Sequence, residues 1–139
     1  MTDIEKAIQN LSGHSICLCR DDEIITDDGR GISPMMRFLA ERKDLKGYAA
    51  ADVIVGKAAA MLFVKADIVC VHGIVMSESG KDYLESSGIS CTYDTLTDKI
   101  INRQGTDICP MEMTVTNIDD AEKGYEALAA KQKEDMNQN

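Results

Sequence analysis

The sequence predicts a single α/β domain in which helices pack on both faces of a mixed sheet of about four to five strands. Three observations lead to this fold class. Apolar residues recur at helical spacing near the N-terminus and then alternate across a short hairpin. Residues 67–75 form an unbroken apolar run, which is typical of a strand covered on both faces. The segment between this run and the next strand is long enough for a right-handed parallel crossover.

The N-terminal part of the chain predicts a helix, a hairpin and a second helix. Apolar residues repeat at helical spacing over 4–11, and Gly13 follows as a helix-ending residue. Segments 15–20 and 23–26 flank a polar turn and predict an N-terminal antiparallel hairpin. A helix is expected over 33–43, because serine followed by proline is a helix-start signal.

The middle of the chain predicts a buried helix followed by two parallel strands. Asp52 is interpreted as the cap of a helix over 53–66 that is apolar nearly all round. Strands are predicted over 67–75 and 89–93. The helix over 77–87 connects them as the crossover.

The segment after these strands is only partly determined by local pattern. A capped helix is expected over 95–103. Residues 111–116 alternate like a strand, whereas Cys109 followed by Pro110 favours a short helix. Both alternatives stay open at this point.

The C-terminal end predicts one more helix and a tail. Asp119 or Asp120 is the expected cap of the last helix. Residues 133–139 are polar and are predicted to be a disordered tail, so that the single domain spans 1–132.

Composition and charge exclude several classes of function. The chain has 15 basic and 24 acidic side chains and a net charge of -9, which opposes binding to nucleic acid or to an anionic membrane. It contains four tyrosines, two phenylalanines and no tryptophan, so it offers few platforms for base stacking. No apolar run reaches the length of a membrane span, and the N-terminus lacks the pattern of a signal peptide. We therefore expect a cytoplasmic protein with neither nucleic acid nor membrane as a partner.

The five cysteines are predicted to be reduced thiols. Their number is odd and none forms a Cys-x-x-Cys pair, which opposes both a disulfide framework and a zinc ribbon. Cys17 and Cys19 share one strand face without a second pair of ligands nearby in the sequence. We therefore predict no metal site and no cofactor.

Residues 102–112 form the most informative stretch of the chain. Arg103, Cys109 and Glu112 are gathered there around a glycine turn. Cys109 precedes Pro110 and would lie at the N-cap of a helix, where unpaired N–H groups and the helix dipole make a thiol more acidic. Nothing else in the sequence completes a recognised catalytic set, so whether the protein is an enzyme stays open.

Two segments resemble a known protein family. Residues 51–60 and 102–112 resemble those of DUF1893, an uncharacterised prokaryotic family, and the similarity runs over roughly residues 5–130. The order of the predicted elements resembles the three-layer α/β/α cytidine-deaminase-like fold. The resemblance implies that fold, a cleft where two helix N-termini converge, and a homodimer.

The resemblance does not extend to the zinc site of a deaminase. A zinc deaminase carries His-x-Glu or Cys-x-Glu at the start of its buried helix and Pro-Cys-x-x-Cys at the start of the next helix. Here Val55-Gly56-Lys57 and residues 77–80 best match those places. Valine and glycine cannot bind zinc, so zinc-dependent deamination is not expected.

We expect the cleft to bind a small anionic metabolite or a nucleotide. Its predicted lining residues are Asp52, Lys57, Arg103, Cys109 and Glu112. Lys57 is too costly to bury unpaired, so its side chain should meet Asp52, Glu112 or a bound anion. Arg30 or Lys81 would add to the positive charge of such a site.

Two other classes of function remain as alternatives. The first is a non-enzymatic interaction or regulatory module, in which these residues only hold the terminal segment against the core. The second is a thiol-dependent enzyme with Cys109 as the nucleophile, and Lys57 or Glu112 would then have to act as its base.

Overall fold

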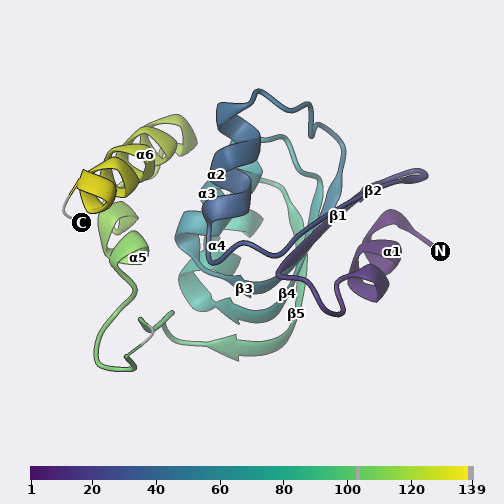
Figure 1. Ribbon diagram of the computed structural model, residues 1–139. Helices are drawn as coiled ribbons and strands as arrows, with labels where there is room; N and C mark the ends of the chain where they lie inside the picture. Colours follow the sequence, from purple (N-terminus) through teal and green to yellow (C-terminus); the bar gives the residue numbers. More distant parts are fainter. Residues whose placement is uncertain (103, 138–139) are drawn as a thin grey trace.

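A five-stranded sheet with helices on both faces forms the centre of the structure, a computed structural model that describes residues 1–102 and 104–137 (Figure 1). The elements in chain order are α1 (Asp3–Asn10), β1 (Ile16–Arg20), β2 (Glu23–Asp27), α2 (Ser33–Ala40), β3 (Ala49–Val55), α3 (Lys57–Lys65), β4 (Cys70–Ser77), α4 (Glu78–Ser86), β5 (Ser90–Thr97), α5 (Pro110–Val115) and α6 (Ala121–Asn137). The chain is therefore an α/β domain, as the sequence predicts.

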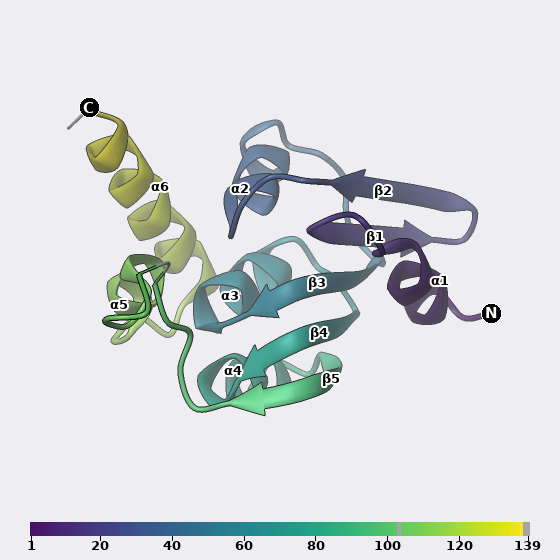
Figure 2. The same cartoon turned by 60° about the horizontal axis from the view of Figure 1, so that its bottom comes forward.

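The sheet is mixed, and its strand order is β2-β1-β3-β4-β5. β1 is antiparallel to both β2 and β3, whereas β3, β4 and β5 are parallel to one another. Figure 2 shows these three parallel strands pointing towards the same edge of the sheet. The carboxyl ends of β3, β4 and β5 and the beginning of β1 consequently lie along one edge, where the chain leaves the sheet into loops and helices.

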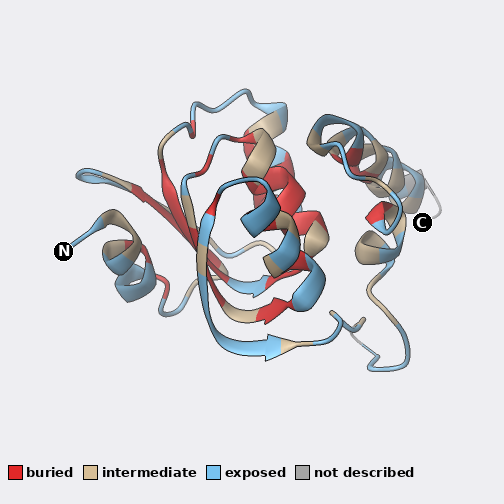
Figure 3. Cartoon of the chain, turned by 180° about the vertical axis from the view of Figure 1, so that it is seen from behind, coloured by how far each residue is buried: buried red, intermediate tan, exposed pale blue. Residues whose placement is uncertain are grey.

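Helices cover the two faces of the sheet unequally. Leu18 and Ala50 belong to the main core, while their neighbours Cys17 and Ala51 belong to a smaller apolar cluster that includes residues of α1. Because successive side chains of a strand point to opposite faces, α1 covers one face and α2, α3 and α4 cover the other. Figure 3 shows that buried residues concentrate in the central strands and in the helices packed on them. α5 and α6 pack beside α3, and Leu128 of α6 is fully buried in the main core.

The structure differs from the sequence prediction between residues 49 and 66. Asp52 does not cap a helix but lies within β3, and α3 begins only at Lys57 with Gly56 as its N-cap. The three consecutive alanines at 49–51 favour a helix locally. β3 nevertheless pairs with β1 on one side and β4 on the other, and this tertiary pairing overrides the weak local preference.

The helix predicted over 95–103 does not form. Residues 95–97 extend β5 instead, because β4 offers them parallel backbone partners as far as Ser77. An isolated antiparallel bridge between Ile101 and Ile108 then holds the base of the following turn. Arg103 lies outside the described residues.

The C-terminal elements are helical. α5 decides the alternative that local pattern leaves open, because residues 110–115 form a helix and not a strand. Asp120 accepts a hydrogen bond from the backbone N–H of Lys123 at 2.9 Å and so caps the start of α6. Residues 133–137, which the sequence assigns to a polar tail, continue this helix, while residues 138 and 139 lie outside the described residues. No helix within 1–102 and 104–137 combines the length and the apolar character needed to cross a membrane.

Gly80 allows the N-termini of α3 and α4 to meet. Ser77 is the N-cap of α4, and its hydroxyl accepts a hydrogen bond from the backbone N–H of Gly80 at 3.0 Å. A Cβ atom at Gly80 would lie 2.9 Å from the carbonyl carbon of Gly56 and 3.0 Å from the carbonyl oxygen of Val55. Both of those atoms belong to the backbone, so they cannot move aside without shifting β3 or α3.

We predict that Gly80→Ala lowers the free energy of unfolding by about 2 to 3 kcal/mol, because overpacking against backbone strains the fold. The matched control is Gly124→Ala in α6, where the new Cβ would meet only the flexible side chain of Met61. Urea unfolding followed by circular dichroism measures both changes. Equal losses in the two variants would contradict a close backbone approach at Gly80.

Candidate functional site

A cavity of about 880 Å³ lies at the edge of the sheet where β3 ends and β1 begins. Its walls come from the loop before β1, residues 28–32 between β2 and α2, Ser33 at the start of α2, the second half of β3, residues 100–102 and 104, and residues 109–112. Gln132 of α6 also lines it. In open α/β sheets, this position at the carboxyl ends of the parallel strands is where ligands bind. The cavity is therefore the candidate functional site of the domain.

Asp52 is the most unusual side chain of this cavity. Only 7% of it is exposed, and its hydrogen-bond donor is the backbone N–H of Ile54, 3.4 Å from Oδ1. No lysine, arginine or histidine of the described residues lies within ion-pair distance of it. Burial raises the pKa of Asp52 to about 8, and hydrogen bonds from the N–H groups of Ile54 and Val53 oppose this rise only in part. The carboxyl group is consequently mostly protonated at neutral pH.

Glu112 caps α3 from a distant part of the chain. Its Oε1 accepts the backbone N–H of Lys57 at 2.8 Å, and its Oε2 accepts that of Ala58 at 2.7 Å. Gly56 makes this approach possible, because a Cβ atom there would lie 2.2 Å from Oε1. Burial raises the pKa of Glu112, while the two N–H groups and the nearby Lys57 charge lower it. The protein's own carboxyl group therefore occupies the N-terminus of α3, the position that attracts anions.

The ammonium group of Lys57 points away from the cavity. Its Nζ donates to the carbonyl oxygen of Thr116 at 3.2 Å and lies 3.6 Å from Oδ1 of Asp119. It also lies 6.0 Å from the centre of the Tyr83 ring. The described ion-pair partner of Lys57 is therefore Asp119, and not Asp52 or Glu112, the two carboxyl groups named from the sequence. The side chain instead fastens the connection between α5 and α6 to the start of α3.

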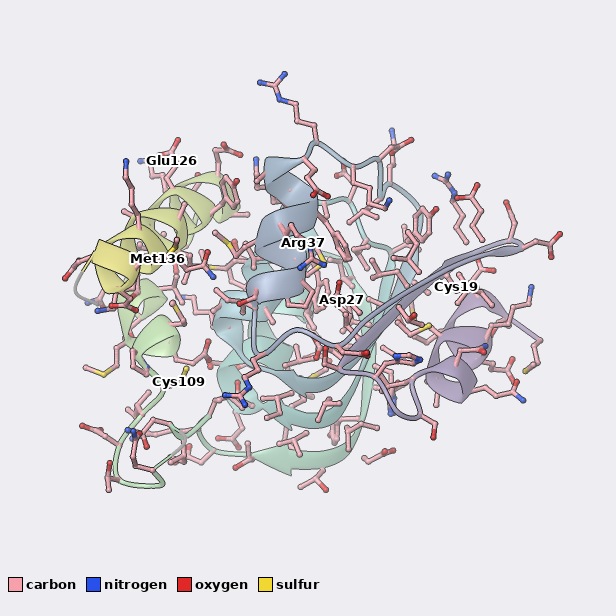
Figure 4. All side chains as sticks on the ribbon, in the orientation of Figure 1. Cys19, Asp27, Arg37, Cys109, Glu126 and Met136 are labelled. Carbon is pink, nitrogen blue, oxygen red and sulfur yellow. The ribbon has the colours of Figure 1, made fainter. Side chains whose placement is uncertain are left out.

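Cys109 does line the cavity. It is half-buried at the N-cap of α5, and its side chain caps no backbone N–H of that helix. Figure 4 labels it where the segment following β5 enters α5. α5 is a short helix of six residues.

A histidine and an arginine complete the charged lining of the cavity. His14, before β1, places Nδ1 2.6 Å from Oδ1 of Asp28, which follows β2. Arg30 is exposed on the same loop and also lines the cavity. The sequence prediction missed the His14 and Asp28 pair, since the two residues meet only when the hairpin closes. The acidic, glycine-rich turn at 27–31 between a strand and a helix was the sequence feature that could have indicated a functional loop there.

The remaining candidate ligands for a metal do not gather at this site. His72 lies in β4, where its Nδ1 is 2.7 Å from Oγ1 of Thr92. Cys17 and Cys19 are buried free thiols beneath α1. Within the part of the chain that the structure describes, no three histidine, cysteine, aspartate or glutamate side chains are placed to hold a metal ion.

Comparison with known proteins identifies the family. Residues 4–131 match the family model described as TM1506, domain of unknown function (DUF1893). The chain belongs to the DUF1893 family. The DUF1893 domain is also similar to a solved structure, that of the DUF1893 family protein TM1506 from Thermotoga maritima, with 27% sequence identity and a TM-score of 0.80. That match covers 89% of this chain and 84% of the other. No curated protein matches the chain.

We predict that Glu112→Ala lowers the free energy of unfolding by about 2 to 4 kcal/mol, because two backbone N–H groups of α3 lose a charged acceptor. Glu112→Gln should cost less, since one acceptor oxygen remains. Glu126→Ala is the control, because Glu126 is exposed on α6 (Figure 4) and its truncation should change stability by less than about 0.5 kcal/mol. Urea unfolding gives all three values. A Glu112→Ala loss as small as that of the control would contradict the capping role.

We predict that the DUF1893 domain loses stability as pH rises from 5 to 8. The pKa of Asp52 is near its usual value of 3.8 in the unfolded chain and about 8 in the folded chain. The folded state thus binds more protons between these values, and stability falls by up to about 1.4 kcal/mol per pH unit. Asp52→Asn should flatten this slope, whereas exposed Asp98→Asn should not. Parallel slopes for wild type and Asp52→Asn in chemical unfolding would contradict the prediction.

Proposed function

We propose that the DUF1893 domain binds a small polar metabolite in the cavity at the carboxyl edge of its sheet. The observation that carries the proposal is Asp52, a carboxyl group more than nine-tenths buried that lines the cavity without an ion-pair partner among the described residues. A buried polar group with few hydrogen bonds destabilises a fold. A ligand that hydrogen-bonds to Asp52 would offset that cost. The burial of Asp52 at the cavity wall therefore supports a ligand that contacts this residue.

The site limits where a negative charge of the ligand can lie. The sequence favours an anionic metabolite or a nucleotide, yet Glu112 fills the N-terminus of α3 and Lys57 points elsewhere. Arg30 is the described cation that remains at the cavity. An anionic group of the ligand is thus proposed to lie on the Arg30 side, and its neutral or donating part on the Asp52 side.

The cytidine-deaminase-like fold is part of the same proposal. The strand order β2-β1-β3-β4-β5 and the close approach of the α3 and α4 N-termini support it. In a zinc deaminase those two N-termini carry the metal ligands. Here Gly56 and Ser77 are the two N-caps, and Glu112 accepts the N–H groups of Lys57 and Ala58, which follow Gly56. We propose that this domain keeps the deaminase-like frame and uses its cavity without zinc.

A thermal-shift screen tests the proposal. The panel contains nucleotides, sugar phosphates, small carboxylates and small amines, because a ligand that binds only the folded state raises the melting temperature. At a concentration of about 100 times its dissociation constant, a ligand adds about 2.7 kcal/mol of stability, which is a shift of several degrees for a domain of this size. Asp52→Asn should lose the shift, and Glu126→Gln should keep it. Absence of any shift across the panel would contradict the proposal.

An interaction module is the second candidate function, and one observation favours it. A groove of about 760 Å³ lies between α2 and α6, next to the cavity. Apolar side chains of both helices line it, among them Met36, Tyr125, Ala129 and Met136. A homodimer or another protein would cover such a surface. If no small molecule binds, this groove becomes the stronger candidate.

Thiol-dependent catalysis by Cys109 has weaker support. The thiol lines the cavity together with His14, and histidine is the side chain that most often acts as the base of a catalytic thiol. Among the described contacts, however, no hydrogen bond joins the thiol to His14, and Glu112 already accepts N–H groups of α3. The proposed site therefore uses Cys109 as a wall of the cavity.

A further inference from the structure

Once Asp52 is ionised, the hydrogen-bonding capacity left on Asp52 and Glu112 consists of acceptors. Each carboxyl oxygen has two lone pairs, and Glu112 uses one on each oxygen for the N–H groups of α3. The bond from Ile54 to Asp52 is long, at 3.4 Å. Both carboxyl groups thus retain acceptor positions at the cavity.

Two polar side chains of the cavity wall already use a donor within the protein. The side-chain amide of Asn102 donates to Oγ1 of Thr106 at 3.3 Å, and the hydroxyl of Ser15 donates to the carbonyl oxygen of Asp27 at 2.9 Å. Both Asn102 and Ser15 line the cavity. A ligand that donates hydrogen bonds therefore fits this end better than one that only accepts them.

The charges of the cavity lead in the same direction. Besides Asp52, the described titratable and charged groups that line the cavity are His14 before β1, Asp28 and Arg30 between β2 and α2, Cys109 at the N-cap of α5, and Glu112 within α5. Asp28 lies beside His14, and Arg30 is exposed. The lysine closest in sequence to this end, Lys57, directs its ammonium group to Thr116 and Asp119. Among the described residues, no cation lies within ion-pair distance of Asp52 or Glu112.

We propose that the Asp52 end of the cavity binds a cationic nitrogen group of a small metabolite, namely an amine, an amidine or a guanidine. This inference rests on the proposed function and names the chemical class of its ligand. The cation would supply both the positive charge and the N–H donors that the cavity lacks at this end. Asp52 would then form a buried ion pair in which each partner is hydrogen-bonded, the arrangement that makes burial of charge tolerable.

Ion pairing at Asp52 requires the loss of a proton. The carboxyl group of Asp52 holds its proton at neutral pH, because burial raises its pKa to about 8. A cation displaces that proton to solvent, so its affinity rises with pH until the pKa of the free protein is reached. An anion would prefer the protonated carboxyl group and lose affinity over the same range. The sign of the pH dependence therefore distinguishes the two classes of ligand.

Three probes of nearly the same shape test the inference, namely benzamidine, benzamide and benzoate, which are cationic, neutral and anionic at pH 6 to 8. Agmatine serves as a flexible cationic probe. We expect titration calorimetry to rank benzamidine above benzamide and benzamide above benzoate. The affinity for benzamidine should rise at least tenfold between pH 6 and pH 8, and buffers of different ionisation enthalpy should show proton release. Asp52→Asn should weaken binding of benzamidine at least tenfold, while Asp98→Asn and Glu126→Gln should bind as the wild type does.

Other outcomes overturn the inference. Preference for benzoate, affinity for benzamidine that falls with pH, or undiminished binding by Asp52→Asn would each exclude a cation at Asp52. If a metabolite of the wider screen binds and neither cationic probe does, the ligand class is wrong while the proposed function stands. If nothing binds in either experiment, both fail. The pH dependence is measured on the unaltered chain, so it stays decisive even if Asp52→Asn folds poorly.

Discussion

The central interaction of this domain is the pair of hydrogen bonds that the Glu112 carboxylate accepts from the backbone N–H groups at the start of α3. They join residues that are 55 positions apart in the chain and supply the capping group that Gly56 lacks. Because Glu112 belongs to α5, the same contact fixes α5 against α3 and sets where α6 begins. A side chain at position 56 would collide with the carboxyl group, so glycine there and glutamate at 112 depend on each other.

This contact also affects which chemical groups the cavity can bind. A helix N-terminus normally attracts an anion from solution, but here a carboxyl group of the protein takes that place. The cavity beside it therefore combines apolar strand residues with acceptors and little exposed positive charge. Lys57, which sequence alone places in the site, holds the α5 and α6 connection through Thr116 instead. The anion site that the sequence suggests around Lys57 therefore stays a prediction.

Much of the fold follows from local pattern, as particular elements illustrate. α1 and α4 have clear start signals at Thr2 and Ser77, whose side chains accept backbone N–H groups. The strand β3 could not be predicted in this way, because its alanine-rich sequence prefers a helix and becomes a strand only between two others. The carboxyl end of β5 escaped prediction for the same reason, since β4 supplies its backbone partners.

The sequence by itself determined the α/β class, the helices with strong caps and the family, since these depend on periodicity and motifs read along the chain. It also placed Asp52, Cys109 and Glu112 among the residues of interest, and the structure brings all three to one cavity. Only the tertiary structure decided that Asp52 is buried without a counter-ion and that Glu112 caps α3. Both properties arise from contacts between segments far apart in the chain, and local pattern carries no information about the solvent exposure or the partners of such groups.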